Sequence, residues 1–274
     1  MSWGDVLTEE EYGRLRLNHE IMRYLELAAK ALGRKPGEVK VLDWGCGRGN
    51  YVCYLRDLGY DAYGVDIDAN VVERGRSFIA SRGYDFERII SVMAPNGTTR
   101  YPSGFFEFVF SYQVLEHVKD LEKVVTELAR ITAPRGTALH IYPARWHITE
   151  AHLSMPFVHW LPKNMVRKWL IAAYVFTGIE PKWKSLDGFS RVERVNAYYR
   201  FSGEATHYRS YSNVVSMFSA HGFLGRSVVL DHPAVKKLPV PGIFRPVLEK
   251  LILHFKSVEL LVERGGDGVR AYAG

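Results

Sequence analysis

One stretch near the start of the chain, residues 39–50, constrains the fold most strongly. Its sequence, VKVLDWGCGRGN, reads as a short buried strand that ends at Asp43, followed by glycines at every second position, Gly45, Gly47 and Gly49. Glycine permits tight turns and lets a ligand approach the main chain where no Cβ intrudes. The helix expected to follow points its free N-terminal amides back at the turn. The stretch therefore predicts a strand–turn–helix unit that holds a ligand carrying a carboxylate or a phosphate.

Strands and helices are expected to alternate after this turn. Hydrophobic runs bounded by turn residues predict seven strands, over 39–43, 61–66, 88–92, 105–111, 137–142, 224–230 and 257–263. Helical spacing and capping residues predict helices from Thr8 to Gly33, and over 50–58, 69–81, 120–131, 212–220 and 244–255. Such alternation with short connections is typical of an α/β fold with a doubly wound, mostly parallel sheet. Ligands of such folds bind at the carboxyl ends of the strands.

The alternation of predicted strands and helices divides the chain into five parts. We expect an N-terminal helical segment (1–38), a ligand-binding core (39–142), an insertion (143–209), the C-terminal part of the core sheet (210–264) and a tail (265–274). The insertion is rich in aromatic residues and proline and shows no clear strand–helix repeat. A long insertion over the strand ends is more often a binding lid than a packing accessory.

Charge and hydrophobicity limit the partners and the location. The net charge is +6, but the basic residues are scattered, which argues against a nucleic-acid-binding tail. No apolar run reaches the ~18 residues that span a bilayer, and the first residues show no signal peptide. These features predict a cytoplasmic protein. Two apolar and basic segments, 160–176 and 244–255, leave peripheral membrane contact open.

The glycine spacing distinguishes between two kinds of nucleotide-like ligand. A dinucleotide site requires G-x-G-x-x-G, and its third glycine would fall at position 50, which is Asn50. The observed order is instead D-x-G-x-G-x-G. An NAD(P) oxidoreductase is therefore disfavoured.

Three motifs together resemble a known family. They are the D-x-G-x-G-x-G turn, the segment FEFVFSYQVLEHV over 106–118, and the A-P-R-G-T turn over 133–137. In this order and spacing they resemble class I S-adenosylmethionine-dependent methyltransferases, in particular the subgroup with ubiquinone and menaquinone biosynthesis enzymes. The resemblance covers about residues 39–142. It implies a Rossmann-like sheet, S-adenosyl-L-methionine as cofactor and methyl transfer to a small-molecule acceptor rather than to nucleic acid.

The resemblance also assigns roles in binding the methionine part of the cofactor. Gly45, Cys46 and Gly47 would offer backbone to the methionine, within the turn that Gly49 completes. Asp43 would hold the amino-acid end.

Further positions would bind the rest of the cofactor. Asp66 would hold the ribose hydroxyls, and Ile67 would lie against the adenine. Met93 and Ala94 would line the adenine pocket, although the acid that the family often places there is absent. Ser111 would supply backbone near the methionine amine.

His117 is the candidate catalytic residue. It follows the fourth strand, near where the methyl group should point, and could act as a base or orient the acceptor. Its alternative role is that of a helix-start histidine that holds Glu116 or backbone. His140, inside the fifth strand, is expected to be a packed histidine.

Other histidines lie in the insertion. His147 and His152 could line the acceptor pocket. A metal site from His147, Glu150, His152 and His159 matches no known ligand spacing, so no metal is expected.

The sequence leaves the acceptor and the oligomeric state open. The lipid-like and aromatic character of the insertion favours an oxygen on a hydrophobic, lipid-linked or sugar-like acceptor. A non-catalytic subunit that binds S-adenosylmethionine is the alternative. An amino methyltransferase of DNA is disfavoured, because no Asn-Pro-Pro-Tyr-like segment follows the fourth strand.

Overall fold

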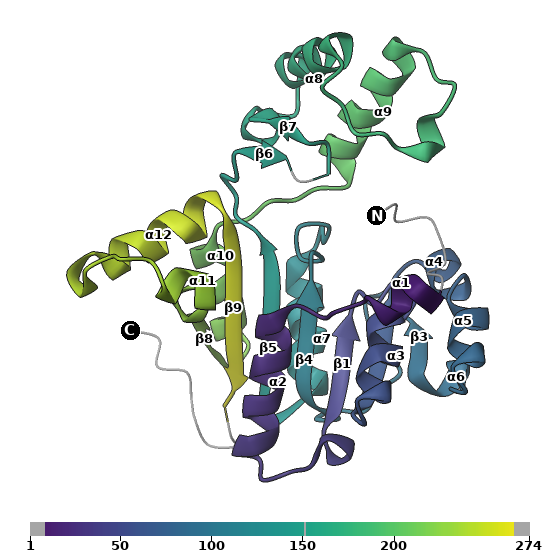
Figure 1. Cartoon of the computed structure of the whole chain (residues 1–274), viewed down its shortest axis with the longest axis vertical. Helices are drawn as coiled ribbons and strands as arrows, with labels where there is room; N and C mark the ends of the chain where they lie inside the picture. Colours follow the sequence, from purple (N-terminus) through teal and green to yellow (C-terminus); the bar gives the residue numbers. More distant parts are fainter. Residues whose placement is uncertain (1–8, 151, 266–274) are drawn as a thin grey trace.

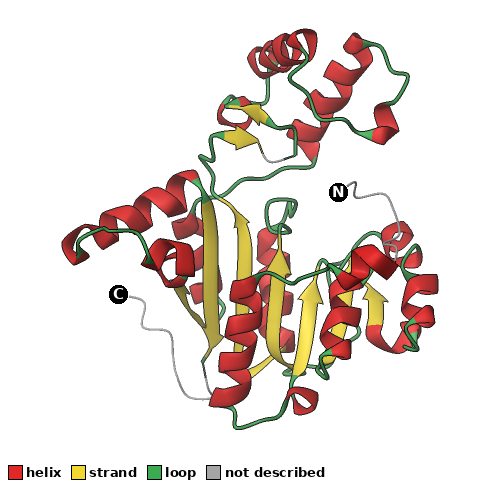
Figure 2. Ribbon diagram, viewed as in Figure 1, coloured by secondary structure: helices red, strands yellow, loops and turns green. Residues whose placement is uncertain are grey.

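A seven-stranded sheet, seen in a computed structural model that describes residues 9–150 and 152–265, carries helices on both faces (Figures 1 and 2). Its strands lie in the order β3-β2-β1-β4-β5-β9-β8. The bounds are β1 (Lys40–Trp44), β2 (Asp61–Asp66), β3 (Ile90–Val92), β4 (Phe106–Tyr112), β5 (Thr132–Pro143), β8 (Phe223–Ser227) and β9 (Ser257–Arg264). Strands β1 to β5 are parallel, and β9 runs antiparallel between β5 and β8. The predicted doubly wound, mostly parallel sheet of seven strands is confirmed.

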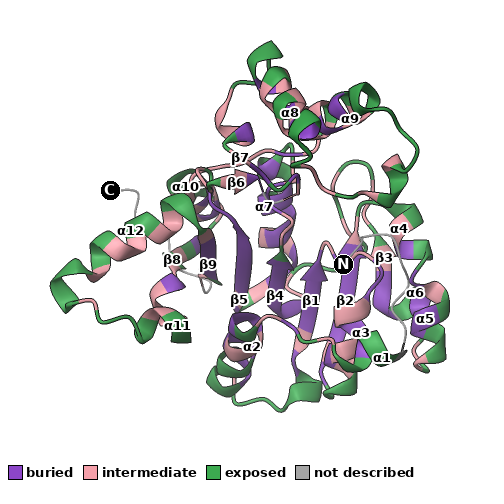
Figure 3. Cartoon of the chain, turned by 45° about the horizontal axis from the view of Figure 1, so that its top comes forward, coloured by how far each residue is buried: buried purple, intermediate pink, exposed green. Residues whose placement is uncertain are grey.

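Helices pack on both faces because every central strand is buried on both sides. The described helices are α1 (Glu9–Gly13), α2 (His19–Ala31), α3 (Asn50–Asp57), α4 (Ala69–Glu73), α5 (Arg76–Ser81), α6 (Phe86–Ile89), α7 (Leu121–Ile131), α8 (Met165–Thr177), α9 (Arg191–Glu204), α10 (Tyr211–Ala220), α11 (Pro233–Lys236) and α12 (Arg245–Phe255). Neighbouring strand residues point to opposite faces. Val41 thus joins the hydrophobic cluster under α2 and α3, while Leu42 joins the one under α7 and α10. Figure 3 shows the resulting buried strands.

Two predicted helices are each interrupted. The N-terminal one is split into α1 and α2, because Asn18 caps α2 by accepting a hydrogen bond from the Glu20 amide. The predicted cap Thr8 lies outside the described residues. The helix over 69–81 is split into α4 and α5 at Gly75, where a Cβ would lie 2.1 Å from the Arg48 carbonyl oxygen. Close approach of the two backbones therefore requires glycine at this position.

Some predicted strand bounds are wrong. The third strand begins at Ile90 rather than 88, because Asp85 caps the short helix α6 just before it. Strand β5 begins at Thr132, before the turn expected to precede it, and β8 ends at Ser227 rather than at 230. These differences do not move the carboxyl ends of β1, β2 and β4, where the ligand is expected.

The insertion packs around a hydrophobic cluster of its own. It contains the short strands β6 (Thr149–Glu150) and β7 (Met155–Pro156) with α8 and α9. Figure 1 shows these elements beyond the carboxyl ends of the parallel strands. Ile171 and Val175 of α8 are buried against residues such as Tyr198 of α9. The apolar run in α8 therefore packs chiefly against the insertion itself.

Among the residues that the structure describes, no helix combines the length and the apolar character needed to cross a bilayer.

Candidate cofactor and acceptor site

The glycine turn lies at the carboxyl end of β1, between β2 and β4. Connections leave β1 and β4 toward opposite sides of the sheet here, so this is the switch point at which such folds bind ligands. The amides of Gly45 and Cys46 donate to the Val65 carbonyl at 2.8 and 3.0 Å. The Gly47 amide donates to the Asp66 carboxylate at 2.8 Å. These three amides are therefore paired within the protein.

Two of the glycines are required by close contacts. Gly45 has φ +84°, and a Cβ there would lie 2.5 Å from the Cγ2 atom of Val114. Gly49 has φ +80°, and its Cβ would lie 2.9 Å from Ile90. Positive φ values are unfavourable for residues with side chains. The turn can therefore approach the loop after β4 at Gly45, and β3 at Gly49, only because these positions are glycine.

Two carboxylates face the turn. Asp43 is 4 % exposed, and burial raises the pKa of its carboxyl well above its usual range, with the nearby charge of Asp66 raising it further. A cationic ligand would stabilise both ionised carboxylates, whereas the pyrophosphate of a dinucleotide would be repelled. The electrostatics therefore favour a ligand with a positive charge, such as a sulfonium or an ammonium group.

The residues expected around ribose and adenine adjoin one another. The Met93 amide donates to the Asp66 carbonyl at 2.8 Å, which places β3's end beside β2's. Ile67 follows Asp66 and is 73 % exposed, so an apolar surface stands free beside the carboxylate. Ala94 lies next to Met93 in a turn closed by the bond from its amide to the Thr98 carbonyl.

Ser111 lies at the end of β4 with its side chain turned into the core. Its hydroxyl is 2.8 Å from Nδ1 of His140, and both residues are fully buried. Burial lowers the pKa of His140 to about 3, so the ring is neutral. Its Nε2 atom has no hydrogen-bond partner in the described residues. Only the backbone of Ser111 can therefore reach a ligand. His140 is packed in the core as expected, but only one of its two ring nitrogens has a hydrogen-bond partner in the described residues.

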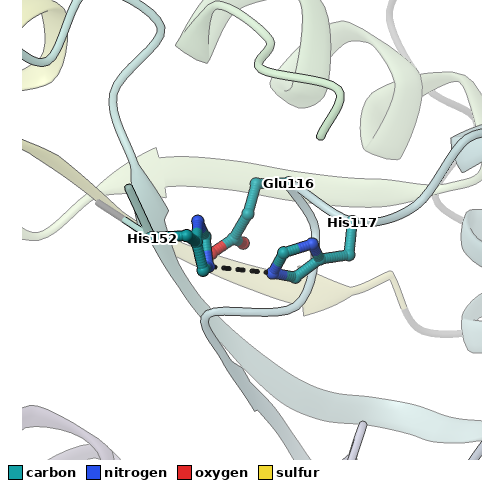
Figure 4. A group of neighbouring side chains, drawn as sticks. All are labelled: Glu116, His117 and His152. Carbon is teal, nitrogen blue, oxygen red and sulfur yellow. Dashed lines mark hydrogen bonds between the residues drawn. The ribbon is translucent and has the colours of Figure 1, made fainter. Parts of the chain in front are cut away.

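His117 lies where the core meets the insertion. Its amide donates to the Val114 carbonyl, in the turn that packs on Gly45. Its Nδ1–H donates to the Ala205 carbonyl at 2.7 Å. Its Nε2 atom lies 3.1 Å from Nε2 of His152. Figure 4 shows both rings and the carboxylate of Glu116 directed toward one another.

Glu150 fixes the position of His152. Its carboxylate accepts from the His152 amide at 2.8 Å, from His152 Nδ1–H at 3.1 Å and from the Tyr208 hydroxyl at 2.5 Å. Burial opposes a charge on His152, but the hydrogen bond and charge of Glu150 outweigh it and raise the pKa of His152. Burial lowers the pKa of His117. The two facing rings therefore differ in basicity.

Glu116 completes this group of neighbouring side chains, and it was not among the site residues predicted from the sequence. It is 1 % exposed, and neither carboxylate oxygen has a hydrogen-bond partner in residues 9–150 and 152–265. Burial raises the pKa of Glu116 to about 7. Its place beside His117 in the V-L-E-H-V segment was the available signal.

The four residues weighed as a metal site do not gather as a set. Glu150 contacts His152, but Nδ1 of His147 faces the Thr149 carbonyl at 2.5 Å. The ring of His159 lies tilted against that of Tyr208, with 4.7 Å between the ring centroids. Neither His147 nor His159 joins the close group at His152.

Comparisons with known proteins place this chain in a family. A family model described as "Methyltransferase domain" matches residues 12–223, well over half of the chain. A probable tocopherol O-methyltransferase of Oryza sativa is 28% identical over 129 residues, which cover 47% of this chain and 34% of the relative. A ubiquinone biosynthesis O-methyltransferase of Pectobacterium atrosepticum is 29% identical over 135 residues, or 49% of this chain and 53% of the relative. The chain thus spans about a third to about half of the length of these relatives.

The fold agrees with a solved structure. The YcgJ protein of Bacillus subtilis matches with a TM-score of 0.50 and 16% identity, over 89% of this chain and 99% of that one. At this identity the match concerns the fold alone. The family model and the fold together confirm the class I S-adenosylmethionine-dependent methyltransferase predicted from the motifs: the chain belongs to the methyltransferase domain family.

Proposed function

We propose that this protein transfers the methyl group of S-adenosyl-L-methionine to an oxygen of a hydrophobic small molecule. The observation that carries the proposal is the pair of carboxylates, Asp43 and Asp66, at the glycine turn of a methyltransferase domain. A cationic cofactor satisfies both charges. Asp66 binds the ribose, Ile67, Met93 and Ala94 surround the adenine, and Asp43 faces the methionine end.

The chemistry requires alignment more than covalent help. A lone pair of the acceptor oxygen forms the bond to the methyl carbon as the carbon–sulfur bond breaks. The sulfur keeps that electron pair and becomes the neutral thioether of S-adenosylhomocysteine, while the hydroxyl proton leaves to a base or to solvent. Positioning and water exclusion supply much of the rate. An insertion beyond the strand ends suits both tasks.

His117 acts on the acceptor side in this proposal. Its Nδ1–H is committed to Ala205, so Nε2 is the atom that presents a lone pair. It belongs to the turn that packs on Gly45, which links the acceptor side to the cofactor side.

Oxygen as the acceptor atom is supported by the relatives. Two of them are O-methyltransferases by name, of tocopherol and of ubiquinone biosynthesis, which favours a phenolic acceptor with an apolar tail. A sterol 24-C-methyltransferase of Yarrowia lipolytica, 24% identical over 76% of this chain, shares the apolar acceptor but methylates carbon by name. A transfer assay with methyl-labelled cofactor and a set of prenylated phenols and catechols tests this. Products whose label is an O-methyl group support the proposal, whereas label found only on nitrogen or carbon contradicts it. Cofactor binding without transfer to any acceptor of the set would favour the non-catalytic subunit instead.

We also propose peripheral contact with an anionic membrane through α12. Val247, Leu251 and Phe255 recur at helical spacing and are each more than 40 % exposed, while Leu253 on another side packs toward the core. Basic residues surround this exposed stripe, among them Lys250, and no residue of α12 is fully buried. An apolar stripe flanked by positive charge suits the interface of an anionic bilayer.

A further inference from the structure

Two histidine rings at the junction of core and insertion face each other in a way that requires a positive charge between them. His117 Nδ1–H is donated to the Ala205 carbonyl, and His152 Nδ1–H to the Glu150 carboxylate. A neutral ring with a protonated Nδ1 has a lone pair on Nε2. The two Nε2 atoms lie 3.1 Å apart. Two neutral rings would therefore oppose lone pair to lone pair.

A third side chain with a possible metal-ligand atom points at the same place. The Glu116 carboxylate is buried and has no hydrogen-bond partner among the described residues. One donor atom of each of Glu116, His117 and His152 lies within 4.8 Å of the others (Figure 4). A proton shared by the two rings would satisfy both Nε2 atoms. It would leave the Glu116 carboxylate unpaired, which is costly for a buried group. A metal ion satisfies all three.

We propose that Glu116, His117 and His152 bind one divalent metal ion of the zinc class. Two imidazoles and one carboxylate form a donor set that suits Zn²⁺ and similar transition metals, and three protein ligands leave coordination positions open. Two nitrogens that each lie ~2.0–2.1 Å from one ion are about 3.3–3.4 Å apart at the tetrahedral angle. The observed separation of 3.1 Å is within a few tenths of an ångström of this spacing.

The surroundings of the two histidines match those of metal ligands. Ligating histidines commonly donate their second N–H to a carboxylate or a backbone carbonyl, which fixes the ring and makes Nε2 the ligating atom. Glu150 and the Ala205 carbonyl play these parts. Glu150 is itself held by Tyr208 and by the amides of His152 and Leu153. The ligands are thus oriented before any ion binds.

The metal ties the insertion to the core and has a role that rests on the proposed function. Glu116 and His117 come from the core and His152 from the insertion, so the ion joins the two parts beside the turn on Gly45. An acceptor hydroxyl that occupies an open position loses its proton to solvent more readily, because the ion stabilises the oxyanion. The oxyanion then attacks the methyl carbon as described above.

The test measures metal binding without turnover. The full-length protein is stripped with a chelator and titrated with Co²⁺, whose visible absorption reports coordination by nitrogen and oxygen, and with Zn²⁺ in competition. His152→Ala and Glu116→Gln each remove one proposed ligand. His221→Ala serves as the matched control, because His221 lies at the end of α10 and its Nε2 atom is 3.2 Å from the carboxylate of Glu122. S-Adenosylhomocysteine binding and thermal unfolding establish that each variant is folded.

The expected result is one Co²⁺ per wild-type chain, displaced by Zn²⁺. Affinity should fall at least about 100-fold in both ligand variants, since even outer-shell changes cost 10- to 100-fold. His221→Ala should bind as the wild type does. The site would be overturned if the wild type bound no stoichiometric metal, or if folded His152→Ala and Glu116→Gln bound Co²⁺ as tightly as the wild type. Metal binding that is intact while no acceptor is methylated would leave the site standing and refute the proposed function.

Discussion

Gly45 shows, at the scale of one residue, how the cofactor turn is tied to the acceptor side. Its lack of a Cβ admits Val114, and the turn from Val114 leads to His117. A change at Gly45 should therefore disturb both backbone and packing. Gly59, at φ +89° with nothing within 4 Å of an added methyl group, isolates the backbone effect alone.

We expect Gly45→Ala to cost more stability than Gly59→Ala. Positive φ should cost each variant of the order of 1–2 kcal/mol. The contact with stiff, β-branched Val114 should add about 1 kcal/mol or more at Gly45. Urea unfolding measures both free energies. Combining Gly45→Ala with Val114→Ala should recover the added part as a coupling energy. Equal losses in the two glycine variants would refute the packing argument.

His140 should make the protein sensitive to acid. Its pKa is about 3 in the folded chain, below the ordinary ~6.5, because burial disfavours the charged ring. As pH falls below 6.5 the unfolded chain binds a proton that the native state does not. Stability is therefore lost progressively between pH 6.5 and 3, with a slope of up to about 1.4 kcal/mol per pH unit.

A variant without this titration separates His140 from other acid-sensitive groups. Unfolding free energies of the wild type and of His140→Gln, measured from pH 7 to pH 4, should show the steeper decline in the wild type. Glutamine can still hydrogen-bond the Ser111 hydroxyl. Parallel profiles would mean that His140 does not titrate as its burial implies.

Sequence reasoning predicted the turn and the strand ends that carry the candidate site, but not the side-chain contacts within it. The glycine turn and the acid at the end of β2 follow from local spacing, and the Gly47 amide does contact Asp66. The contact between His117 and His152 spans 35 residues and depends on how the insertion folds back. No periodicity records such a contact. The unpaired carboxylate of Glu116 could likewise be recognised only once its surroundings were known.

At the scale of elements, periodicity predicted which helices and strands exist better than it predicted where they begin and end. Strand β2 and helix α7 begin and end as expected to within a residue, because Asp120 caps α7 by accepting from the Lys123 amide. The need for glycine at position 75 could not be read locally, since it arises from the Arg48 backbone in the turn after β1. Long-range close approach is invisible to a pattern along one segment.

We predict that helix α12 binds anionic membranes. Vesicles that contain phosphatidylserine should co-float with the wild type, whereas vesicles of phosphatidylcholine alone should bind less. The double change Val247→Glu and Leu251→Glu should reduce co-flotation at least about tenfold, because it places charge on the apolar stripe. Leu58→Glu, at a similarly exposed leucine after α3, is the control. Equal binding by both variants would contradict membrane contact through α12.

At the scale of the whole molecule, the cofactor turn and the insertion rest on different hydrophobic clusters. The strands around the turn share the two core clusters, whereas Leu153, Ile171 and Tyr198 belong to a third. Replacing residues 148–206 with a Gly-Ser linker should therefore leave S-adenosylhomocysteine affinity within about threefold, as for independent sites. Methyl transfer to the acceptor should be lost. A folded core that no longer binds S-adenosylhomocysteine would show that the insertion completes the cofactor site.

The central claim, that Asp66 and the glycine turn hold S-adenosylmethionine, is tested most directly by titration calorimetry with S-adenosylhomocysteine. The wild type should bind one molecule per chain, and Asp66→Ala should bind at least about tenfold more weakly, because charge-assisted hydrogen bonds contribute ~1.5–3 kcal/mol. Asp120→Ala, which removes a carboxylate that caps α7, should bind like the wild type. Failure of the wild type to bind, or equal affinity of Asp66→Ala and wild type, would contradict the account.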